Sequence, residues 1–268
     1  MNYTDYIKRR IQHKENRVPW NFGHKFDTHE FCIANRIPVP ELFAKFDDPK
    51  DISLRDLPER FVLKPSYSST SKGVFVLERR GEGRYFDFMS GSDVSADDVV
   101  AAQTKIFDSH TKAKRKFTLA EEYLEDAVVG GVPEDYKFMA FQGVIGLIIK
   151  INRNGDKLSM SYFDGEFRPV FDERIDFKSS LADLQISETP SNWRRLLDVA
   201  RRASVIVPSP FARIDLFDTT RGPVLGEITL TPGSFYYPNG HVLSTDENER
   251  LGRLWKEAEI RLWGESTV

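Results

Sequence analysis

The most informative stretches of this chain are Ala-Arg-Ile-Asp-Leu-Phe at 212–217 and Val-Leu-Gly-Glu-Ile-Thr-Leu-Thr-Pro-Gly at 224–233. Polar and apolar residues alternate in both with the period of two that is typical of a β-strand. The Asp-Thr-Thr-Arg-Gly-Pro segment at 218–223 is rich in turn-forming residues, so the sequence predicts a β-hairpin. This hairpin would bring the carboxylates of Asp215 and Glu227 close together.

Two close carboxylates repel each other unless a cation lies between them. Magnesium is the ordinary cation for such a pair, because it binds carboxylate oxygens together with substrate phosphates. Arg213 and Thr229 are predicted on the same faces as Asp215 and Glu227, and Thr-Pro-Gly-Ser at 231–234 is a tight backbone element that could approach a ligand. The alternative interpretation is a hairpin with a solvated polar face.

The pattern resembles the metal-binding hairpin of ATP-grasp enzymes and is close to that of D-alanine:D-alanine ligases. The resemblance implies that Asp215 and Glu227 hold magnesium and that Arg213 contacts the reacting phosphate or acyl group. The third metal ligand of the superfamily is usually an Asn two residues after the Glu, where this chain has Thr229. A hydroxyl is the weaker ligand, so the number of metal ions, one or two, stays open.

A second segment is predicted to form strand, loop and strand. Phe-Val-Leu-Lys-Pro at 61–65 ends in Lys64 and a proline, and the hydroxyl-rich loop at 66–73 leads to a second apolar run at 74–77. Backbone N–H groups and hydroxyls of such a loop can close over phosphates. The segment lacks the spacing of a Walker P-loop, and taken alone it also fits a surface hairpin. Its resemblance to the ATP-grasp phosphate loop implies nucleotide contacts by Lys64, Ser68, Ser69, Thr70, Ser71 and Lys72.

Two further runs, at 117–126 and 133–143, resemble the adenine hinge of the superfamily. The resemblance implies that backbone groups from Glu121 to Leu124 bind the adenine edge and that Asp135 binds the ribose hydroxyls. A solvated helix or strand end is the alternative for Glu121, Glu122 and Glu125, and it is preferred for Glu122. The implied nucleotide-binding residues of these runs are Glu121, Tyr123, Leu124, Asp135 and Lys137.

Three motifs that follow one another in a fixed order along the chain are a more specific signal of a protein family than any one of them alone. They are Leu-Pro-x-x-Phe-Val-Leu-Lys, Pro-x-Asp-Tyr-Lys-Phe-x-x-Phe-x-Gly and Gly-Glu-Ile-Thr-Leu-Thr-Pro-Gly. Together they resemble the TupA-like branch of the ATP-grasp superfamily, which is named for teichuronopeptide biosynthesis. The resemblance extends from about residue 27 to residue 237.

The composition excludes several other classes of protein. With 40% hydrophobic and 29% charged residues among 268, the chain is an ordinary globular protein and not a disordered one. The net charge of −3 argues against non-specific binding to nucleic acid or membranes. The single cysteine, Cys32, excludes an internal disulfide, and the five histidines lack zinc spacing. Without an apolar run of about twenty residues or a signal peptide, we expect no membrane span and a cytoplasmic location.

The expected fold is α+β of the ATP-grasp type, with two lobes, ATP between them and a shortened N-terminal region. The expected parts are an N-terminal helical segment at 1–57, a small lobe at 58–125, and a large lobe at 126–268 with the metal-binding hairpin and a C-terminal helix. Helices are predicted at 4–15, 28–36, 96–103 and 191–203, and a last one is capped by Ser244 with Glu247 three residues on. Strands are predicted at 138–141, 144–151, 158–163 and 167–170.

The resemblance implies an ADP-forming carboxylate–amine ligase that uses ATP and Mg²⁺. A carboxylate would attack the γ-phosphate to give an acyl phosphate, and an amine would then displace phosphate to form an amide. Arg213 and Lys64 would be catalytic, and Asp215, Glu227 and Thr229 would be the metal ligands, because charge on the transferring phosphoryl group needs electrostatic stabilisation. The expected partners are a small-molecule carboxylate and an amine, such as an amino acid, a sugar acid or a peptide, and a homo-oligomer is left open.

Two other functions remain open from the sequence. The first is an ATP-grasp kinase, in which the phosphate goes to a hydroxyl and stays there. The second is a non-catalytic nucleotide-binding protein, which is favoured only by the serine-rich loop and by Thr229.

Overall fold

The structure is a computed structural model that describes residues 1–68, 72–113, 115–128, 132–154, 157–177, 182–237 and 241–264. The chain forms two compact units. One unit comprises Met1–Gly23, Asp27–Val39 and Asp126–Val268, and the other comprises His24–Phe26 and Pro40–Glu125. The predicted boundaries at 57 and 125 stay predictions.

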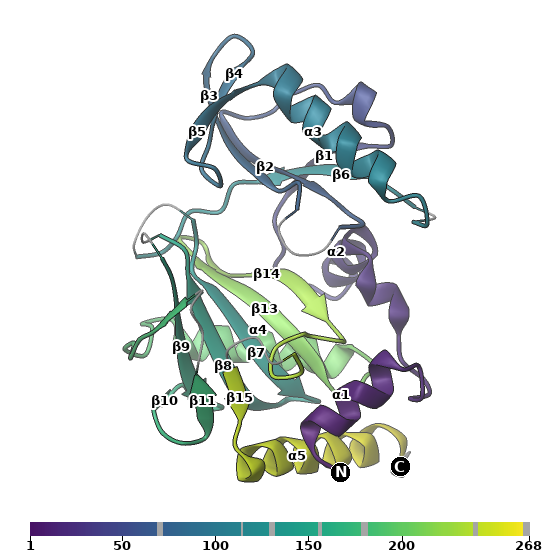
Figure 1. The fold of residues 1–268 in the computed structure, drawn as a ribbon, viewed down its shortest axis with the longest axis vertical. Coiled ribbons are helices and arrows are strands. Elements are labelled where there is room, and N and C mark those ends of the chain that lie inside the picture. Colours follow the sequence, from purple (N-terminus) through teal and green to yellow (C-terminus); the bar gives the residue numbers. More distant parts are fainter. Residues whose placement is uncertain are drawn as a thin grey trace. The chain divides into compact units, whose positions relative to one another are not determined.

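The smaller unit is built on a six-stranded antiparallel sheet (Figure 1). Its elements are β1 (Leu42–Phe46), η2 (Pro49–Asp51), β2 (Arg60–Pro65), β3 (Phe75–Gly81), β4 (Arg84–Asp87), β5 (Ser92–Ser95), α3 (Ala96–Ser109) and β6 (Thr118–Glu122). The strand order is β1-β6-β2-β3-β4-β5. Val99 of α3 packs with Phe61, Leu63 and Leu77 of the sheet in one buried cluster, which holds the helix on the sheet.

The larger unit contains a seven-stranded sheet, a two-stranded sheet and four α-helices along its described ranges. Its elements are α1 (Tyr3–Ile11), η1 (Trp20–Gly23), α2 (Lys25–Ala34), β7 (Asp135–Phe141), β8 (Val144–Asn152), β9 (Leu158–Asp164), β10 (Pro169–Val170), β11 (Ile175–Phe177), β12 (Ala182–Leu184), α4 (Trp193–Ile206), β13 (Ala212–Thr219), β14 (Gly222–Thr229), β15 (His241–Leu243) and α5 (Thr245–Trp263). The main order is β10-β9-β8-β7-β13-β14. β12 pairs in parallel with β9, and β11 pairs with β15.

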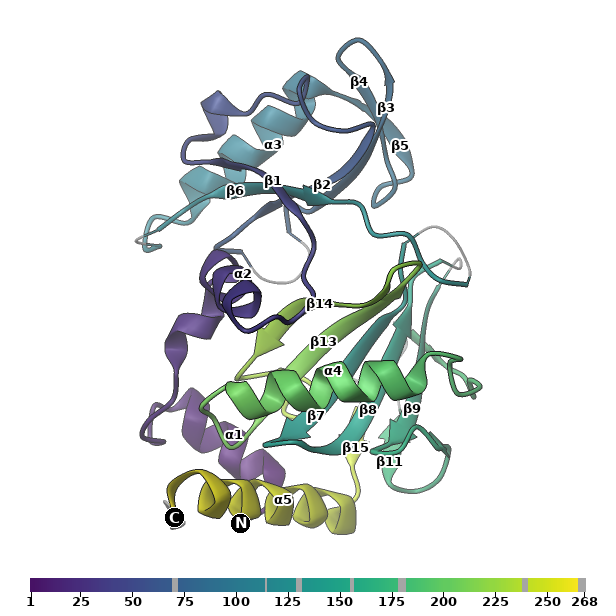
Figure 2. The ribbon, with the colours of Figure 1, turned by 180° about the vertical axis from the view of Figure 1, so that it is seen from behind.

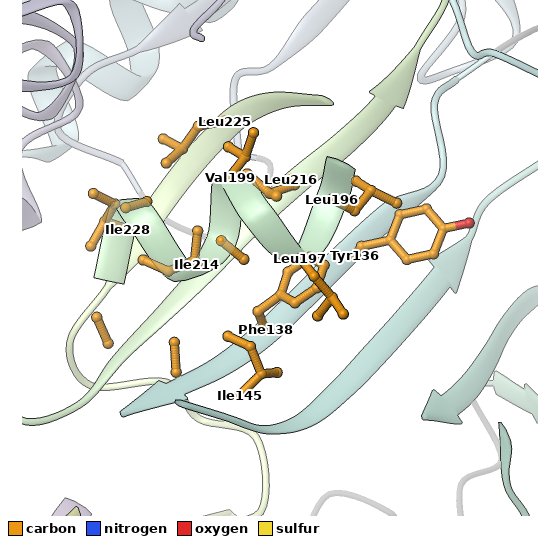
Figure 3. Close-up of a cluster of buried hydrophobic side chains, with 14 of the residues drawn as sticks. Tyr136, Phe138, Ile145, Leu196, Leu197, Val199, Ile214, Leu216, Leu225 and Ile228 are labelled. Atoms are coloured by element: carbon orange, nitrogen blue, oxygen red, sulfur yellow. The ribbon is translucent and has the colours of Figure 1, made fainter. Parts of the chain in front are cut away.

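Helix α4 covers one face of the large sheet (Figure 2). Its residues Leu196 and Val199 are buried against Ile214, Leu216 and Ile228 of the hairpin strands (Figure 3). Because strand side chains alternate between faces, the residues that flank these apolar ones point away from α4. Arg213, Asp215, Glu227 and Thr229 therefore lie on the other face, whereas Asp218 near the turn lies on the α4 side, where it accepts a hydrogen bond from Asn192.

Helices α1 and α5 pack together and contribute to the second core of the same unit. Trp255 of α5 is fully buried and stacks on Tyr6 of α1 and on Phe211, which precedes β13. Ser244 caps α5 by accepting a hydrogen bond from the N–H of Glu247, so the predicted cap is confirmed.

The predicted helices exist, with shifted ends. The first starts at Tyr3 because Asn2 is its N-cap, and α4 follows Asn192, whose side chain makes no capping hydrogen bond. Helix α3 extends to Ser109 and opens with a capping box formed by Ser95 and Asp98. The strands β1, β4, β5, β11, β12 and β15 were not predicted, and of the strand predicted at 167–170 only Pro169–Val170 forms β10. A membrane-spanning helix is absent from the described ranges, since every helix there is too short or too polar to cross a bilayer.

Candidate active site

The predicted hairpin is confirmed, and it places the two carboxylates opposite each other. Asp215 of β13 pairs with Glu227 of β14, and Arg213 pairs with Thr229. The strands are longer than the sequence indicated, because pairing continues until Thr219 meets Gly222 and leaves a two-residue turn. All four predicted residues of the hairpin thus form two cross-strand pairs, with the pair Ile214–Ile228 between them.

A β-bulge explains why Glu227 points toward the site. Asp215 pairs with Glu227 and Leu216 with Leu225, so Gly226 is the extra residue of β14. A Cβ at Gly226 would lie 2.5 Å from the ring of Phe217, so a larger residue would clash there. The bulge lets Leu225 and Ile228, three residues apart, both join the core under α4 while Glu227 stays outside it.

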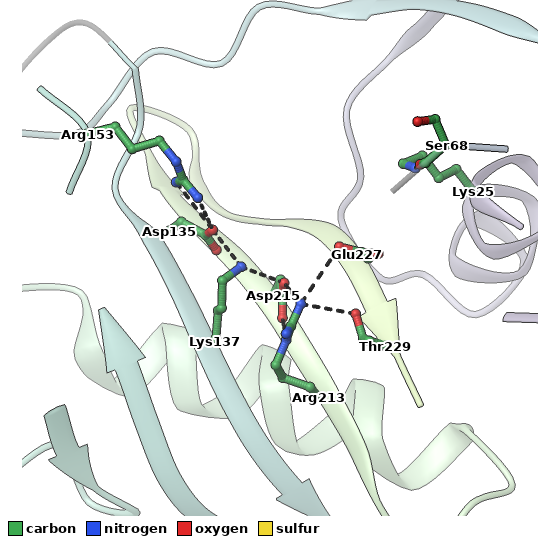
Figure 4. Close-up of polar contacts among 9 residues, drawn as sticks. All are labelled: Lys25, Ser68, Asp135, Lys137, Arg153, Arg213, Asp215, Glu227 and Thr229. Atoms are coloured by element: carbon green, nitrogen blue, oxygen red, sulfur yellow. Dashed lines mark hydrogen bonds and ion pairs between the residues drawn. The ribbon is translucent and has the colours of Figure 1, made fainter. Parts of the chain in front are cut away.

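Arg213 contacts the other three site residues of the hairpin, which are Asp215, Glu227 and Thr229 (Figure 4). Its Nε and Nη2 each donate to one oxygen of Asp215 at 2.7 Å. Nη2 also donates to Thr229 Oγ1 at 3.1 Å and lies 3.8 Å from Glu227 Oε2. The guanidinium therefore provides positive charge between the two carboxylates.

Lys137 extends this network to the next strand. It lies opposite Asp215 across the β7–β13 pairing, with its Nζ 2.7 Å from Asp215 Oδ2 and 2.6 Å from Asp135 Oδ2. Arg153 is 3.4 Å from the same oxygen of Asp135. The other oxygen, Asp135 Oδ1, is buried and has no hydrogen-bond partner among the described residues. Water or a ligand is the expected partner of such an oxygen.

The pKa values of Asp215 and Arg213 are shifted by the charged groups around them. Burial alone would raise the pKa of Asp215, but Arg213 and Lys137 outweigh it and hold that pKa below its ordinary value. Burial alone would lower the pKa of Arg213, but Asp215, Glu227 and Asp135 together raise it. The carboxylate and the guanidinium are therefore both ionised at neutral pH.

A buried arginine from the N-terminal helix holds the open end of the hairpin. Arg10 is fully buried and donates to the carbonyls of Phe211 and Leu230, which flank the start of β13 and the end of β14. Its guanidinium also forms an ion pair with Glu15 at 2.6 Å and lies over the ring of Trp255. Arg10 therefore fixes the strand ends next to Arg213 and Thr229.

The donor set of the hairpin suits magnesium in part. A carboxylate has about four acceptor sites, and Asp215 uses three of them on Arg213 and Lys137. Glu227 is 47% exposed, and its contact with Arg213 is 3.8 Å long. Oxygen donors of this kind fit Mg²⁺ that keeps waters and substrate phosphates. No group of three acidic, histidine or cysteine side chains that could hold a metal occurs in the described part of the chain.

The smaller unit places the other predicted residues around β2 and β6. Lys64 forms an ion pair with Glu121, and both side chains are largely buried. The carbonyl of Ser68 accepts a hydrogen bond from Lys25 Nζ (Figure 4). Tyr123 packs on Phe88, Leu124 is buried, and Lys72 is exposed. The predicted phosphate contacts Ser69, Thr70 and Ser71 lie outside the described residues.

Sequence reasoning missed three groups near these sites. Arg153 reaches Asp135 through the pairing of β7 with β8, which no local pattern indicates. Lys25 and Arg10 act on residues that are distant in the chain. For Gly226 a signal existed, since apolar residues three apart at 225 and 228 break the alternation of a regular strand.

The fold is that of the ATP-grasp enzymes. The chain is similar to D-alanine–D-alanine ligase from Bacillus anthracis, with 15% identity, a TM-score of 0.56, and coverage of 90% of this chain and 68% of that one. The structure of that ligase complexed with ATP gives 14% identity, a TM-score of 0.52, and coverage of 90% and 66%. A RimK domain ATP-grasp protein from Sphaerobacter thermophilus gives 12% identity and a TM-score of 0.51, with coverage of 88% of this chain and 67% of that one. The chain spans about two thirds of the length of each.

The sequence identifies the branch. The family model described as TupA-like ATPgrasp matches residues 6–254, so this chain belongs to the TupA-like ATP-grasp family. The resemblance and the expected fold class are therefore confirmed. No curated protein matches the sequence.

Proposed function

We propose that this protein is an ATP-dependent ligase that joins a carboxylate to an amine and releases ADP and phosphate. The observation that carries the proposal is the direct pairing of Asp215 with Glu227, with the Arg213 guanidinium between them. Membership of the ATP-grasp family and the similarity of its fold to ligases support it. We propose an amino acid, a sugar acid or a peptide among the substrates.

The proposed reaction has two steps. A carboxylate oxygen of the first substrate attacks the γ-phosphorus of ATP, the bond from that phosphorus to the bridging oxygen of ADP breaks, and an acyl phosphate forms. The amine then attacks the acyl carbon, and phosphate leaves with the oxygen that came from the carboxylate. When bound, Mg²⁺ would neutralise phosphate charge.

Each residue of the site has a proposed role in these steps. Asp215, Glu227 and Thr229 would hold the metal, and Asp135 and Lys137 would bind the nucleotide. Arg213 would stabilise negative charge on the transferring phosphoryl group and then on the tetrahedral adduct, since its charge is held in place by Asp215. Lys64 would contribute a second cation to the phosphates. Arg213 is paired with Asp215 and Lys64 with Glu121, so each cation is restricted before substrate arrives, which lowers the cost of orienting it.

Trapping of the acyl phosphate tests the proposal. The protein is incubated with ATP, Mg²⁺ and a set of candidate acids, with hydroxylamine in place of the amine. We expect a hydroxamate and an equal amount of ADP for the correct acid, and neither product with Asp215→Asn. With the true pair of substrates, ¹⁸O-labelled carboxylate should deliver one label to the released phosphate. Phosphate that remains on the organic product would show a kinase, and ATP binding without turnover of any substrate would show a non-catalytic protein.

A further inference from the structure

A second set of cations lies on the face of the large sheet that is opposite to Asp215. A cavity of about 430 Å³ lies beside α4, where the turn between β13 and β14 meets the helix. Its lining residues are Pro38, Arg194, Arg195, Asp198, Val199, Arg202, Arg221 and Pro223. Because Ile214 and Leu216 face α4 while Asp215 joins the network on the other face, this cavity is separate from the proposed active site.

The cavity is positively charged. Four guanidinium groups and one carboxylate line it, a formal net charge of +3. Asp198 pairs with Arg202 at 3.3 Å, but their side chains are 67% and 51% exposed, so solvent screens this pair. Asp218, which accepts a hydrogen bond from Asn192, lies close enough to Arg195 to feel its charge. The cations outnumber the acids around the cavity.

Arg195 is held over the turn without a charged partner in contact. A Cβ at Gly222 would lie 3.2 Å from Nη2 of Arg195, so the absence of a side chain at this residue makes room for the guanidinium. In the described part of the chain, the side chain of Arg195 makes neither a hydrogen bond nor an ion pair, and the side chain of Arg194 only lies over the ring of Trp193. Guanidinium N–H groups bind phosphate and carboxylate oxygens in pairs.

The rest of the cavity wall is apolar and is fixed by the fold. Pro38, Val199 and Pro223 supply this surface. The carbonyl of Pro38 accepts a hydrogen bond from the N–H of Leu225, and Arg221 donates to the carbonyl of Val39. The segment 38–39 is therefore attached to the hairpin at two points. A ligand for this place needs an anionic end for the arginines and an apolar or planar body for the prolines.

We propose that this cavity binds a phosphate monoester that carries an apolar or planar group. A dianionic phosphate matches the surplus of cations better than a monocarboxylate does, since each unit of charge adds to the attraction. Its three oxygens can also accept several N–H groups at once. The proposal concerns a site separate from ATP turnover and does not depend on the ligase reaction.

Calorimetric titration with phenyl phosphate tests the proposal. Benzoate has a similar ring with one charge, and inorganic phosphate lacks the ring. We expect phenyl phosphate to bind at least tenfold more tightly than either, and its binding to weaken as sodium chloride is raised. Arg195→Gln should weaken binding about tenfold or more, and Arg195→Lys should restore it only in part. Arg168→Gln, which removes another exposed arginine that is 77% exposed, is the control and should leave binding unchanged.

Chemical protection locates the probe without any variant. Phenylglyoxal modifies accessible arginines, and peptide mass spectrometry measures each site. Phenyl phosphate should protect Arg194 and Arg195, and Asp215→Asn should leave this protection and the binding intact. Equal affinity of Arg195→Gln and the unaltered protein, or an absence of protection at both arginines, would overturn the proposal. Loss of binding in Asp215→Asn that is shown to be folded by circular dichroism would place the probe in the nucleotide site and would also overturn the proposal.

Discussion

Lys137 on β7 lies directly opposite Asp215 on β13, and its Nζ is 2.7 Å from the aspartate Oδ2. The same ammonium is 2.6 Å from Asp135 Oδ2. Both carboxylates are buried, and a charge that is desolvated without a partner is costly. The pairing of β7 with β13 therefore makes one lysine the counter-charge for two acids.

Removal of this lysine should destabilise the protein. Lys137→Met leaves Asp135 and Asp215 with less compensation, so we expect the free energy of unfolding in urea to fall by about 3 kcal/mol or more at pH 7. Lys157→Met is the control, because the ion pair of Lys157 with Asp183 has side chains that are 44% and 55% exposed. Its loss should cost less than about 1 kcal/mol. Equal losses in the two variants would contradict a special role for Lys137.

Variants of the two hairpin carboxylates should lose activity to a similar extent but differ in their free energy of unfolding. Asp215→Asn and Glu227→Gln should each reduce ADP release about a hundredfold or more, because each removes a charge from the proposed metal site. Asp215→Asn should also lower stability, since Arg213 and Lys137 lose their shared partner. Glu227 is 47% exposed, so its variant should unfold within about 0.5 kcal/mol of the unaltered protein. Full turnover by Glu227→Gln would refute its proposed role.

Thr229 should tolerate a substitution that keeps an oxygen acceptor. Its Oγ1 accepts from Arg213, and the amide oxygen of Thr229→Asn can replace it and is the more usual metal ligand of the superfamily. We expect turnover of Thr229→Asn to match the unaltered protein. Thr229→Val, of similar shape, removes the acceptor and should lower kcat/KM about tenfold. If both variants keep full activity, the hydroxyl serves neither the metal nor Arg213.

Lys64 should contribute to ATP binding as well as to the stability of the fold. ATP with Mg²⁺ should raise the Tm, because a ligand that binds only the native state adds about 2.7 kcal/mol at a hundredfold excess over its Kd. Lys64→Ala should reduce this shift, whereas Lys50→Ala on the exposed turn η2 should not. The measurement is a thermal melt with and without millimolar nucleotide. An absent shift with both ATP and ADP in the unaltered protein would refute the nucleotide site.

The pH dependence of stability should reveal the ionised Asp215. Arg213 and Lys137 hold its pKa in the folded state below the ordinary 3.8 despite burial. Its contribution to stability is therefore fully present above the unfolded pKa and is lost as the pH falls through the lower, folded one. The difference in unfolding free energy between the unaltered protein and Asp215→Asn should be constant from pH 7 to about pH 5 and shrink only below about pH 4. A difference that shrinks between pH 7 and pH 5 would contradict an ionised, paired Asp215.

The hairpin follows from local sequence patterns. The alternation around Arg213 and Asp215, the turn residues after them and the second alternating run specify two paired strands, because the period of two is a local property of extended backbone. The same local rules predicted Ser244 as the cap of the last helix. The three motifs that resemble the TupA-like family are each contiguous in the chain and lie within residues 6–254, the range that the family model matches.

Which charged side chains contact each other depends on long-range packing. Lys137 reaches Asp215 because β7 pairs with β13 across 78 positions of sequence, and Arg10 reaches Phe211 across 201. Neither contact has a local pattern, since pairing register depends on the burial of whole strand faces. The bulge at Gly226 and the arginine cavity beside α4 likewise arise where distant segments pack. Local sequence patterns specify elements and motifs, whereas long-range packing decides which side chains share a buried environment and hence which of them stay charged.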